Sequence, residues 1–249
     1  MKNQNFTSLQ TLRVMACNNF ELFPAGGLSA PNLTSIFLFD LKLKSLPEKM
    51  HTLLPSLRQL FLWNCPEIEC FPEGGLPSSL EDRTIDLCQT LWRSCRREWG
   101  LQRLPSLTHF ELSGTDEEET LLPDDFLLPS TLRSLRLASH KDLKMLNFEL
   151  LQRITCLESL EIEHCPLLHS LPEEGLPESL SRLIIDSCPL LKQRLEFEKG
   201  EDWHKVVHIH HIEVDGYSAP YLLQNLLVAL LTVSTVSNKG ILLGNFIHL

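Results

Sequence analysis

Residues 57–65 read LRQLFLWNC, and residues 157–165 read LESLEIEHC. Each stretch places a leucine first, apolar residues three and five positions later, and a cysteine eight positions later. This leucine, the anchor of the unit, recurs at eight places that are 23 to 27 residues apart, namely Leu9, Leu33, Leu57, Leu80, Leu107, Leu132, Leu157 and Leu180. The chain is therefore an array of repeats of one structural unit.

A period of this length with a central L-x-L is typical of the leucine-rich repeat, which stacks into a curved solenoid. Apolar and outward-facing residues alternate from the second to the sixth position after each anchor. This alternation predicts a short parallel strand. Proline and glycine crowd the rest of each unit, as in residues 71–77 and 171–177, which disfavours long helices. We therefore expect an α/β solenoid of about eight repeats, with strands on the concave face and turns, short 3₁₀ and irregular segments on the convex face.

The repeat pattern divides the chain into three parts. Residues 1–195 form the repeat array, residues 196–216 a closing segment whose run from Val206 to Val214 is strand-like, and residues 217–249 an apolar tail. Gln224 and Asn225 interrupt the tail, which falls short of the 20 or so apolar residues that a membrane helix needs, so we expect poor order there. Because a full repeat begins at Leu9 without a polar cap, we expect a fragment of a longer receptor or a truncated gene product.

The charge balance is acidic. The 22 Lys and Arg residues face 32 Asp and Glu residues, a net charge of −10. A nucleic-acid binder needs cations that displace counterions from phosphate, so this class is excluded, and attraction to anionic lipid is not expected. No apolar leader follows Met1, which favours the cytoplasm, with the nucleus or the membrane periphery as alternatives.

Five of the eight cysteines are explained by the repeat. Cys17, Cys65, Cys88, Cys165 and Cys188 stand eight residues after their anchors, where a side chain points inward and can bond to the backbone of the adjacent coil. Small buried thiols with weak S–H donors suit this position. We predict reduced structural thiols, with disulfides or a metal site as the alternatives.

One repeat breaks the pattern. Arg83 occupies the position of a buried leucine, between Leu80 and Ile85. Because burial of an unpaired guanidinium is costly, we expect this coil to be distorted or locally open. The same repeat is the longest, at 27 residues. In the next repeat the acidic run Asp116–Glu119 reads as a solvated loop.

The outward strand positions give the candidate partner-binding residues. Repeats two and three place four aromatic side chains together, namely Phe37, Phe39, Phe61 and Trp63. Exposed aromatic clusters are typical of binding hot spots, although a segment of the same protein is an alternative occupant. Further along, the face is mostly acidic, with Asp82, Asp86, Glu111, Glu161, Glu163 and Asp186 interrupted by Arg136 and Arg182. Such a face steers a basic partner, or is simply a solvated charged surface.

Motifs for catalysis are missing. The sequence contains neither a G-x-S-x-G elbow nor a Gly-rich phosphate loop. His208 and His210 share one face of an expected strand, but no nearby carboxylate or cysteine completes a metal-ligand set. We therefore expect a protein that is not an enzyme, without catalytic, cofactor-binding or metal-binding residues.

Three stretches carry a resemblance to a known family. Residues 160–172 (LEIEHCPLLHSLP), 97–107 (REWGLQRLPSL) and 203–216 (WHKVVHIHHIEVDG) resemble the C-terminal repeats of plant intracellular nucleotide-binding leucine-rich-repeat disease-resistance proteins of the coiled-coil class. The resemblance covers roughly residues 6–216. It implies that the repeats bind a pathogen effector, a guarded host protein or the receptor's own nucleotide-binding domain, and that they restrain a nucleotide switch. The G-x-x-x-x-G-K-[ST] loop that would bind ATP or ADP does not occur in these residues, so no cofactor is expected in this chain.

Two other functions remain open on the sequence. Repeats with cysteine at this position also occur in F-box adaptors of ubiquitin ligases, but no F-box precedes Leu9. A leucine-rich-repeat receptor ectodomain would bring a signal peptide, flanking paired cysteines and an apolar span, of which the chain shows only a poor version of the span.

Overall fold

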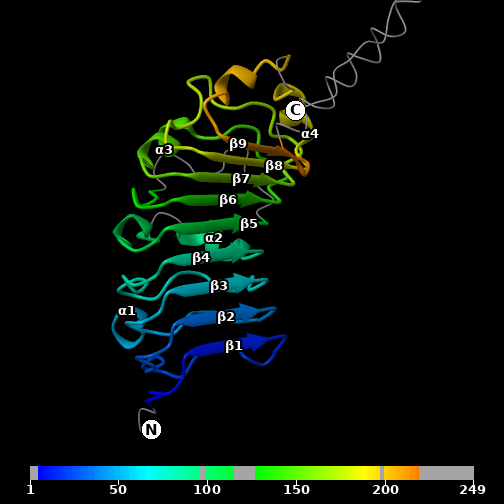
Figure 1. The fold of residues 1–249 in the computed structure, drawn as a ribbon. Coiled ribbons are helices and arrows are strands. Elements are labelled where there is room, and N and C mark those ends of the chain that lie inside the picture. Colours follow the sequence, from blue (N-terminus) through cyan, green and yellow to red (C-terminus); the bar gives the residue numbers. More distant parts are fainter. Residues whose placement is uncertain (1–4, 96–98, 115–126, 197–198, 219–249) are drawn as a thin grey trace, which may run out of the picture.

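The computed structural model describes residues 5–95, 99–114, 127–196 and 199–218, which form one stack of coils (Figure 1). Ten strands follow chain order across a single sheet. They are β1 (Thr11–Met15), β2 (Ser35–Phe39), β3 (Gln59–Trp63), β4 (Asp82–Asp86), β5 (His109–Ser113), β6 (Ser134–Ala138), β7 (Ser159–Glu163), β8 (Arg182–Asp186), β9 (His211–Val214) and β10 (Tyr217–Ser218). Strands β1 to β8 each begin two residues after an anchor leucine, which confirms the predicted solenoid and its eight repeats.

The sheet is closed differently at its C-terminal end. Strand β9 pairs parallel to β8, whereas β10 pairs antiparallel to β9. The strand-like run expected from Val206 is shorter than predicted, because residues 206–208, which follow the 3₁₀ helix η3 (Trp203–Lys205), form a turn and pairing starts only at His211. The sheet also continues two residues past Gly216. The predicted tail from residue 219 onward lies outside the described residues.

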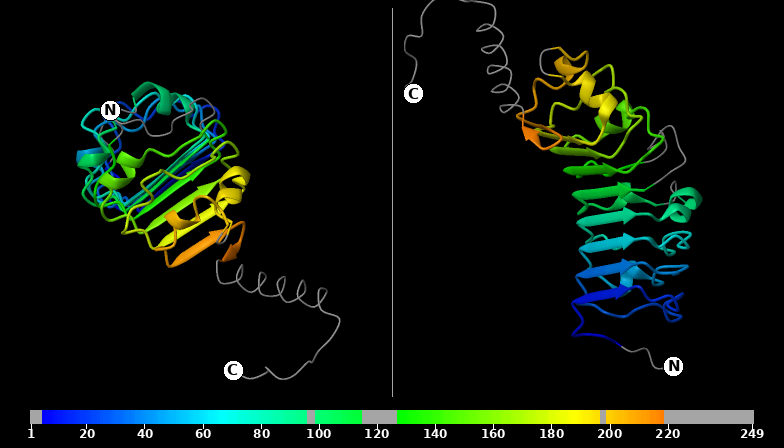
Figure 2. Two further views of the ribbon diagram at one scale, coloured as in Figure 1. Left: turned by 90° about the horizontal axis from the view of Figure 1, so that it is seen from above. Right: turned by 90° about the vertical axis from the view of Figure 1, so that its right-hand side faces the viewer.

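In the described residues the helices of the convex side are short, as the proline and glycine content predicted. They are α1 (Met50–Leu53), α2 (Gln89–Cys95), η2 (Leu101–Arg103), α3 (Phe148–Arg153) and α4 (Pro189–Arg194). Figure 2 shows the strands lined up on one side of the stack and these helices and turns on the other. No helix in the described ranges has the length and apolar character needed to cross a membrane.

Strands β1 to β9 each end in the same left-handed turn. The residue seven positions after the anchor has a positive φ in every repeat, and the first residue after β9 repeats the turn. These residues are Ala16, Asp40, Asn64, Leu87, Gly114, Ser139, His164, Ser187 and Asp215. A left-handed residue other than glycine costs about 1–2 kcal/mol, so the stack accepts this cost at eight of the nine turns. The turn sets the direction in which the next residue points.

That next residue is the cysteine of the repeat. Cys65, Cys88, Cys165 and Cys188 are buried, and the thiols of Cys65 and Cys188 lie 3.7 Å from the carbonyl oxygens of Leu38 and Ile162 in the preceding coils. His140 takes the same place, with Nε2 3.0 Å from the carbonyl oxygen of Leu112. A hydrogen bond with the neighbouring thiol and burial raise the pKa of Cys88 and of Cys165, so both stay protonated.

The five cysteines of the repeat positions are free thiols, as predicted, and so are Cys70 and Cys156. Cys17 is the exception to the inward position, because it is exposed. The prediction that it is buried is wrong. Cys17 follows β1, the edge strand of the sheet, and no other strand among the described residues lies on its far side to cover it.

Arg83 does not open its coil. Strand β4 keeps unbroken register with both neighbours, and Arg83 is fully buried between Leu60 and Phe110. Its guanidinium carbon lies 4.0 Å from the ring centroid of Phe71, 4.7 Å from that of Trp99 and 5.6 Å from that of Phe110. Cation–π attraction in a desolvated site is worth about 2 kcal/mol or more. The predicted distortion is therefore wrong, because aromatic rings enclose the cation.

The closing segment is held by a buried carboxylate. Asp202 accepts hydrogen bonds from Arg194 Nε (3.1 Å) and Nη2 (3.0 Å), from Lys205 Nζ (2.9 Å) and from the backbone N–H of Leu171 (2.9 Å). Its side chain is 1% exposed. These bonds tie the closing segment to α4 and to the return of the seventh repeat.

Candidate functional site

The outward side chains of the strands form straight rows across the concave face. Register places the third residues of the strands in a middle row, namely Arg13, Phe37, Phe61, Thr84, Glu111, Arg136, Glu161, Ile184 and Glu213. The fifth residues form the row beside it, namely Met15, Phe39, Trp63, Asp86, Ser113, Ala138, Glu163 and Asp186. The first residues of the strands form a third row, and Asp82 of β4 lies in this row. The spacing of the repeats predicted these neighbours correctly.

The four aromatic residues lie in one cluster, which we call the aromatic patch (Phe37, Phe39, Phe61 and Trp63). The rings of Phe37 and Phe61 stack with centroids 4.8 Å apart and an interplanar angle of 10°. Phe39 completes the cluster, 6.3 Å from Phe37 and 6.4 Å from Trp63. The side of Trp63 remains open, since the residue is 42% exposed. The patch is therefore a preformed apolar platform.

Two neighbours on β1 extend the patch. The guanidinium carbon of Arg13 lies 4.7 Å from the ring centroid of Phe37, and Met15 is exposed in register with Phe39. The candidate list drawn from the sequence did not include either residue. Their positions in the two rows were available from the spacing, but a stacked cation is not a residue type that an aromatic pattern selects.

The acidic residues do not act as one group. Arg136 binds Glu111 (2.5 Å) and Glu163 (2.6 Å), and its Nε lies 3.7 Å from Glu161. The structure thus gathers four of the predicted residues into one network on β5, β6 and β7. Asp82 and Asp86 lie apart on β4 beside the aromatic patch, and Asp186 lies on β8.

Two of these carboxyl groups have a raised pKa. Burial raises the pKa of Asp82, against the attraction of His109. Burial also raises the pKa of Glu111, although Arg136 and a hydrogen bond from Thr84 lower it. A desolvated carboxylate gains most from an added cationic partner, so these two positions favour a positively charged ligand.

Replacing Arg136 with glutamine is expected to raise the pKa of Glu111 further, because the closest attractive charge is lost while burial remains. The measurement is a carbon-detected NMR titration of the Glu111 carboxyl group. Arg133→Gln serves as the control, since the exposed Arg133 pairs with Glu158. An unchanged or lower pKa in the Arg136 variant would contradict the network.

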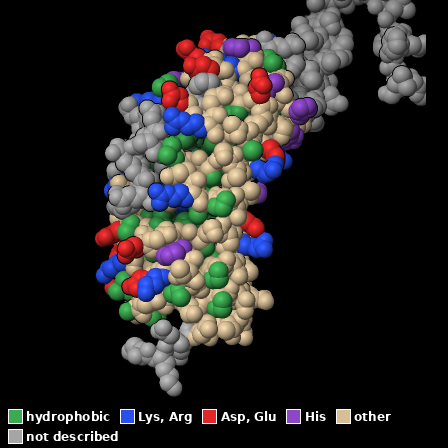
Figure 3. All heavy atoms as spheres, turned by 90° about the vertical axis from the view of Figure 1, so that its left-hand side faces the viewer, with side chains coloured by type: hydrophobic (Ala, Val, Ile, Leu, Met, Phe, Trp, Pro, Cys, Tyr) green, Lys and Arg blue, Asp and Glu red, His purple; other side chains and the backbone are tan. Residues whose placement is uncertain are grey.

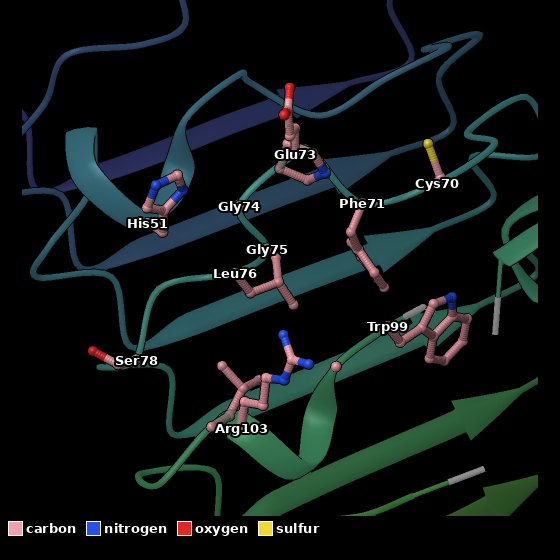
Figure 4. A pocket seen from close by; sticks show the side chains of 13 residues that line it. His51, Cys70, Phe71, Glu73, Gly74, Gly75, Leu76, Ser78, Trp99 and Arg103 are labelled. Atoms are coloured by element: carbon pink, nitrogen blue, oxygen red, sulfur yellow. The ribbon is translucent and has the colours of Figure 1, made fainter. Parts of the chain in front are cut away.

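A separate cavity of about 610 Å³ opens on the convex side (Figure 4). Phe71 and Trp99 line it together with Leu76 and Arg103. The same two rings cover Arg83, so the buried cation lies directly behind the cavity wall. Figure 3 shows Lys and Arg interspersed with Asp and Glu on the side that carries α1 and α3. No cluster of metal-binding side chains occurs in the part of the chain that the structure describes.

Comparison with known proteins places this fold in a family context. No family model matches the chain. A protein of Arabidopsis thaliana that is named for disease resistance is 40% identical to it over 195 residues. The chain is a leucine-rich-repeat relative of plant disease-resistance proteins. A protein of Solanum bulbocastanum that is named disease resistance protein RGA4 also matches, with 36% identity over 55 residues.

The chain spans only a small part of the length of either relative. The Arabidopsis match covers 78% of the chain and 13% of that protein, and the Solanum match covers 21% of the chain and 6% of that protein. Among solved structures, the leucine-rich repeat domain of the type III effector XopL is similar, with 21% identity, a TM-score of 0.43, and coverage of 74% of this chain and 70% of that one. The assignment to leucine-rich repeats rests on the sheet register described above, and the resemblance to plant disease-resistance proteins predicted from residues 97–107, 160–172 and 203–216 is confirmed.

Proposed function

We propose that this chain is a protein-recognition surface of a plant disease-resistance receptor and that its partner binds the concave face. The aromatic patch carries this proposal, because four large rings lie together on an exposed sheet face. Aromatic anchors in well-packed clusters supply most of the energy of protein interfaces. A leucine-rich-repeat solenoid is typically an interaction module, so the role is binding and not catalysis.

The partner is a pathogen effector, a guarded host protein or the nucleotide-binding domain of the receptor itself. In the resting receptor the repeats restrain the nucleotide switch, and partner binding releases it. ADP or ATP then belongs to the nucleotide-binding domain, and this chain needs no cofactor. We place the receptor in the cytoplasm.

The double substitution Phe61→Ala and Trp63→Ala tests this proposal. Peptides selected from a random phage-displayed library against the wild-type chain are expected to bind the double variant at least about 30-fold more weakly, since loss of a hot spot costs about 2 kcal/mol or more. Biolayer interferometry with immobilised chain measures the affinities, and circular dichroism confirms folding.

The matched control is Leu190→Ala. Leu190 lies on α4, outside the concave rows, and is as exposed as Trp63, at 42%. Binding should survive this change. Selected peptides that bind the double variant as well as the wild type would refute recognition through the aromatic patch.

A further inference from the structure

Thr84 stands where the aromatic patch meets the acidic part of the face. We name this place the junction and define it by Phe61, Trp63, Asp82, Asp86 and Glu111 around Thr84. Phe61 and Glu111 flank Thr84 in the middle row, and Asp82 and Asp86 precede and follow it by two residues on β4. Thr84 is the smallest side chain of this row between β2 and β8. The junction is thus a low point with rings on one side and carboxylates on the others.

The rings of the junction stand beside its carboxylates, and Trp63 is exposed. Trp63 is paired in register with Asp86 and Phe61 with Thr84, so rings and carboxylates stand on adjacent strands. Neighbouring strands lie about 4.8 Å apart. A flat cation that stacks on either ring is therefore within hydrogen-bonding reach of a carboxylate.

The carboxylates of the junction have spare acceptors. Asp86 accepts one hydrogen bond through Oδ1, from Ser113 Oγ at 2.8 Å, which leaves Oδ2 for another donor. Among the described side chains, Asp82 pairs with no donor and has only the attraction of His109 to offset its burial. Glu111 is shared between Arg136 and Thr84.

The same row already uses arginine on both sides of this place. On one side, Arg13 stacks on Phe37 at 4.7 Å. On the other, Arg136 lies between Glu111 and Glu163 at 2.5 and 2.6 Å. The junction offers both of these environments at once, a ring face and carboxylates, yet Thr84 supplies no cation of its own.

We propose that the junction binds the guanidinium of an arginine on the partner protein, stacked on Trp63 or Phe61 and paired with Asp86. This inference rests on the proposed function, because it names the chemistry of the partner that the concave face recognises. Arginine fits better than lysine, since its planar group stacks on rings and presents its donors in a fixed fork. The excess of carboxylates on the face steers such a partner towards it.

The probe for this inference is a blocked peptide, acetyl-Leu-Gly-Arg-Gly-Leu-amide. Its binding is followed by NMR through the Trp63 indole N–H, assigned with Trp63→Phe. The comparison peptide carries citrulline, which keeps the shape of arginine without the charge. We expect the citrulline peptide to bind at least about tenfold more weakly, because a charge-assisted hydrogen bond is stronger than a neutral one. Raised salt should weaken only the arginine peptide.

The variant Asp86→Asn should lower the affinity for the arginine peptide by about tenfold as well. Glu149→Gln removes the same charge from α3, outside the concave rows, and should change the affinity less than twofold. Equal binding of the two peptides, including no binding of either at millimolar concentration, overturns the inference. So does an equal effect of the two variants.

The two proposals fail in different ways. If selected library peptides need Phe61 and Trp63 but prefer no arginine and tolerate Asp86→Asn, the aromatic patch stands and the guanidinium site falls. If the peptides tolerate loss of both rings, recognition through the aromatic patch falls, and this inference falls with it.

Discussion

Replacing Asp202 with asparagine is expected to lower the free energy of unfolding by about 3–5 kcal/mol, because removal of one partner from a buried ion pair leaves the other charge uncompensated. The asparagine keeps the shape of the side chain but cannot neutralise Arg194 and Lys205, both within 3.1 Å of the carboxylate. Urea denaturation followed by circular dichroism measures the change. The closing segment and α4 should lose hydrogen-exchange protection first.

Glu201→Gln is the matched control for Asp202. Glu201 binds the same arginine at 2.5 Å, but its side chain is 75% exposed. Exposed pairs contribute at most about 1 kcal/mol, so this variant should stay close to the wild type. If the two substitutions lower the free energy of unfolding equally, burial of the Asp202 network adds nothing to its stabilising effect.

The Asp202 network also predicts an acid dependence. Burial raises the pKa of Asp202, but hydrogen bonds from Arg194, Lys205 and Leu171 outweigh burial and lower the pKa to about 2, from an ordinary value of 3.8. A carboxyl group with a depressed pKa stabilises the fold above its unfolded-state pKa, and this contribution is lost as the pH falls towards 2. Between pH 4 and pH 2 the wild type should lose more stability than Asp202→Asn.

Arg83→Met is expected to raise the free energy of unfolding by about 1–4 kcal/mol, the range found when buried ionic groups are replaced by apolar ones of similar volume. Within the described residues, none of the three guanidinium nitrogens of Arg83 has a hydrogen-bond partner. Burial holds its pKa well below the usual value. Methionine fills most of the volume between Phe71, Trp99 and Phe110 without the desolvation cost. Thermal and urea denaturation measure the gain.

The opposite sign for Arg83→Met would be equally informative. A loss of stability would mean that the three rings hold the cation by more than its desolvation costs. The control is Arg182→Met, an exposed arginine on β8, for which a change within about 0.5 kcal/mol is expected. Because the pKa of Arg83 is lowered in the folded state, the free energy of unfolding of the wild type should approach that of Arg83→Met as the pH rises above the folded-state pKa of Arg83.

The sequence predicted the sheet better than the environments of single side chains. Counting from each anchor placed Phe61 beside Thr84 and Glu111 beside Arg136 correctly, because a parallel stack with one strand per repeat leaves no freedom in register. Arg83 was misjudged because the rings that enclose it come from three different repeats, and their convergence depends on the paths of the returns. Asp202 gave no periodic pattern, since its partners lie in α4, in η3 and in the seventh repeat.

The candidate site shows the same division. The aromatic patch and the acidic positions follow from the spacing, since each is an outward residue of a strand. The pairing of Arg136 with Glu111 and Glu163, and the stacking of Arg13 on Phe37, depend on side-chain rotamers that a repeat pattern does not specify. Which carboxylates remain available to a partner was therefore visible only in the structure.

The recurring left-handed turn after each strand separates two kinds of sequence change. Insertions and deletions fall in the convex returns, where units of 23 to 27 residues all lead into a five-residue strand. On the concave side each outward residue has a fixed position in the sheet, which is set by its distance along the chain from the anchor leucine. A single substitution there changes one outward side chain and leaves the positions of its neighbours unchanged. The binding specificity of the concave face can therefore change by single substitutions without a change in the fold.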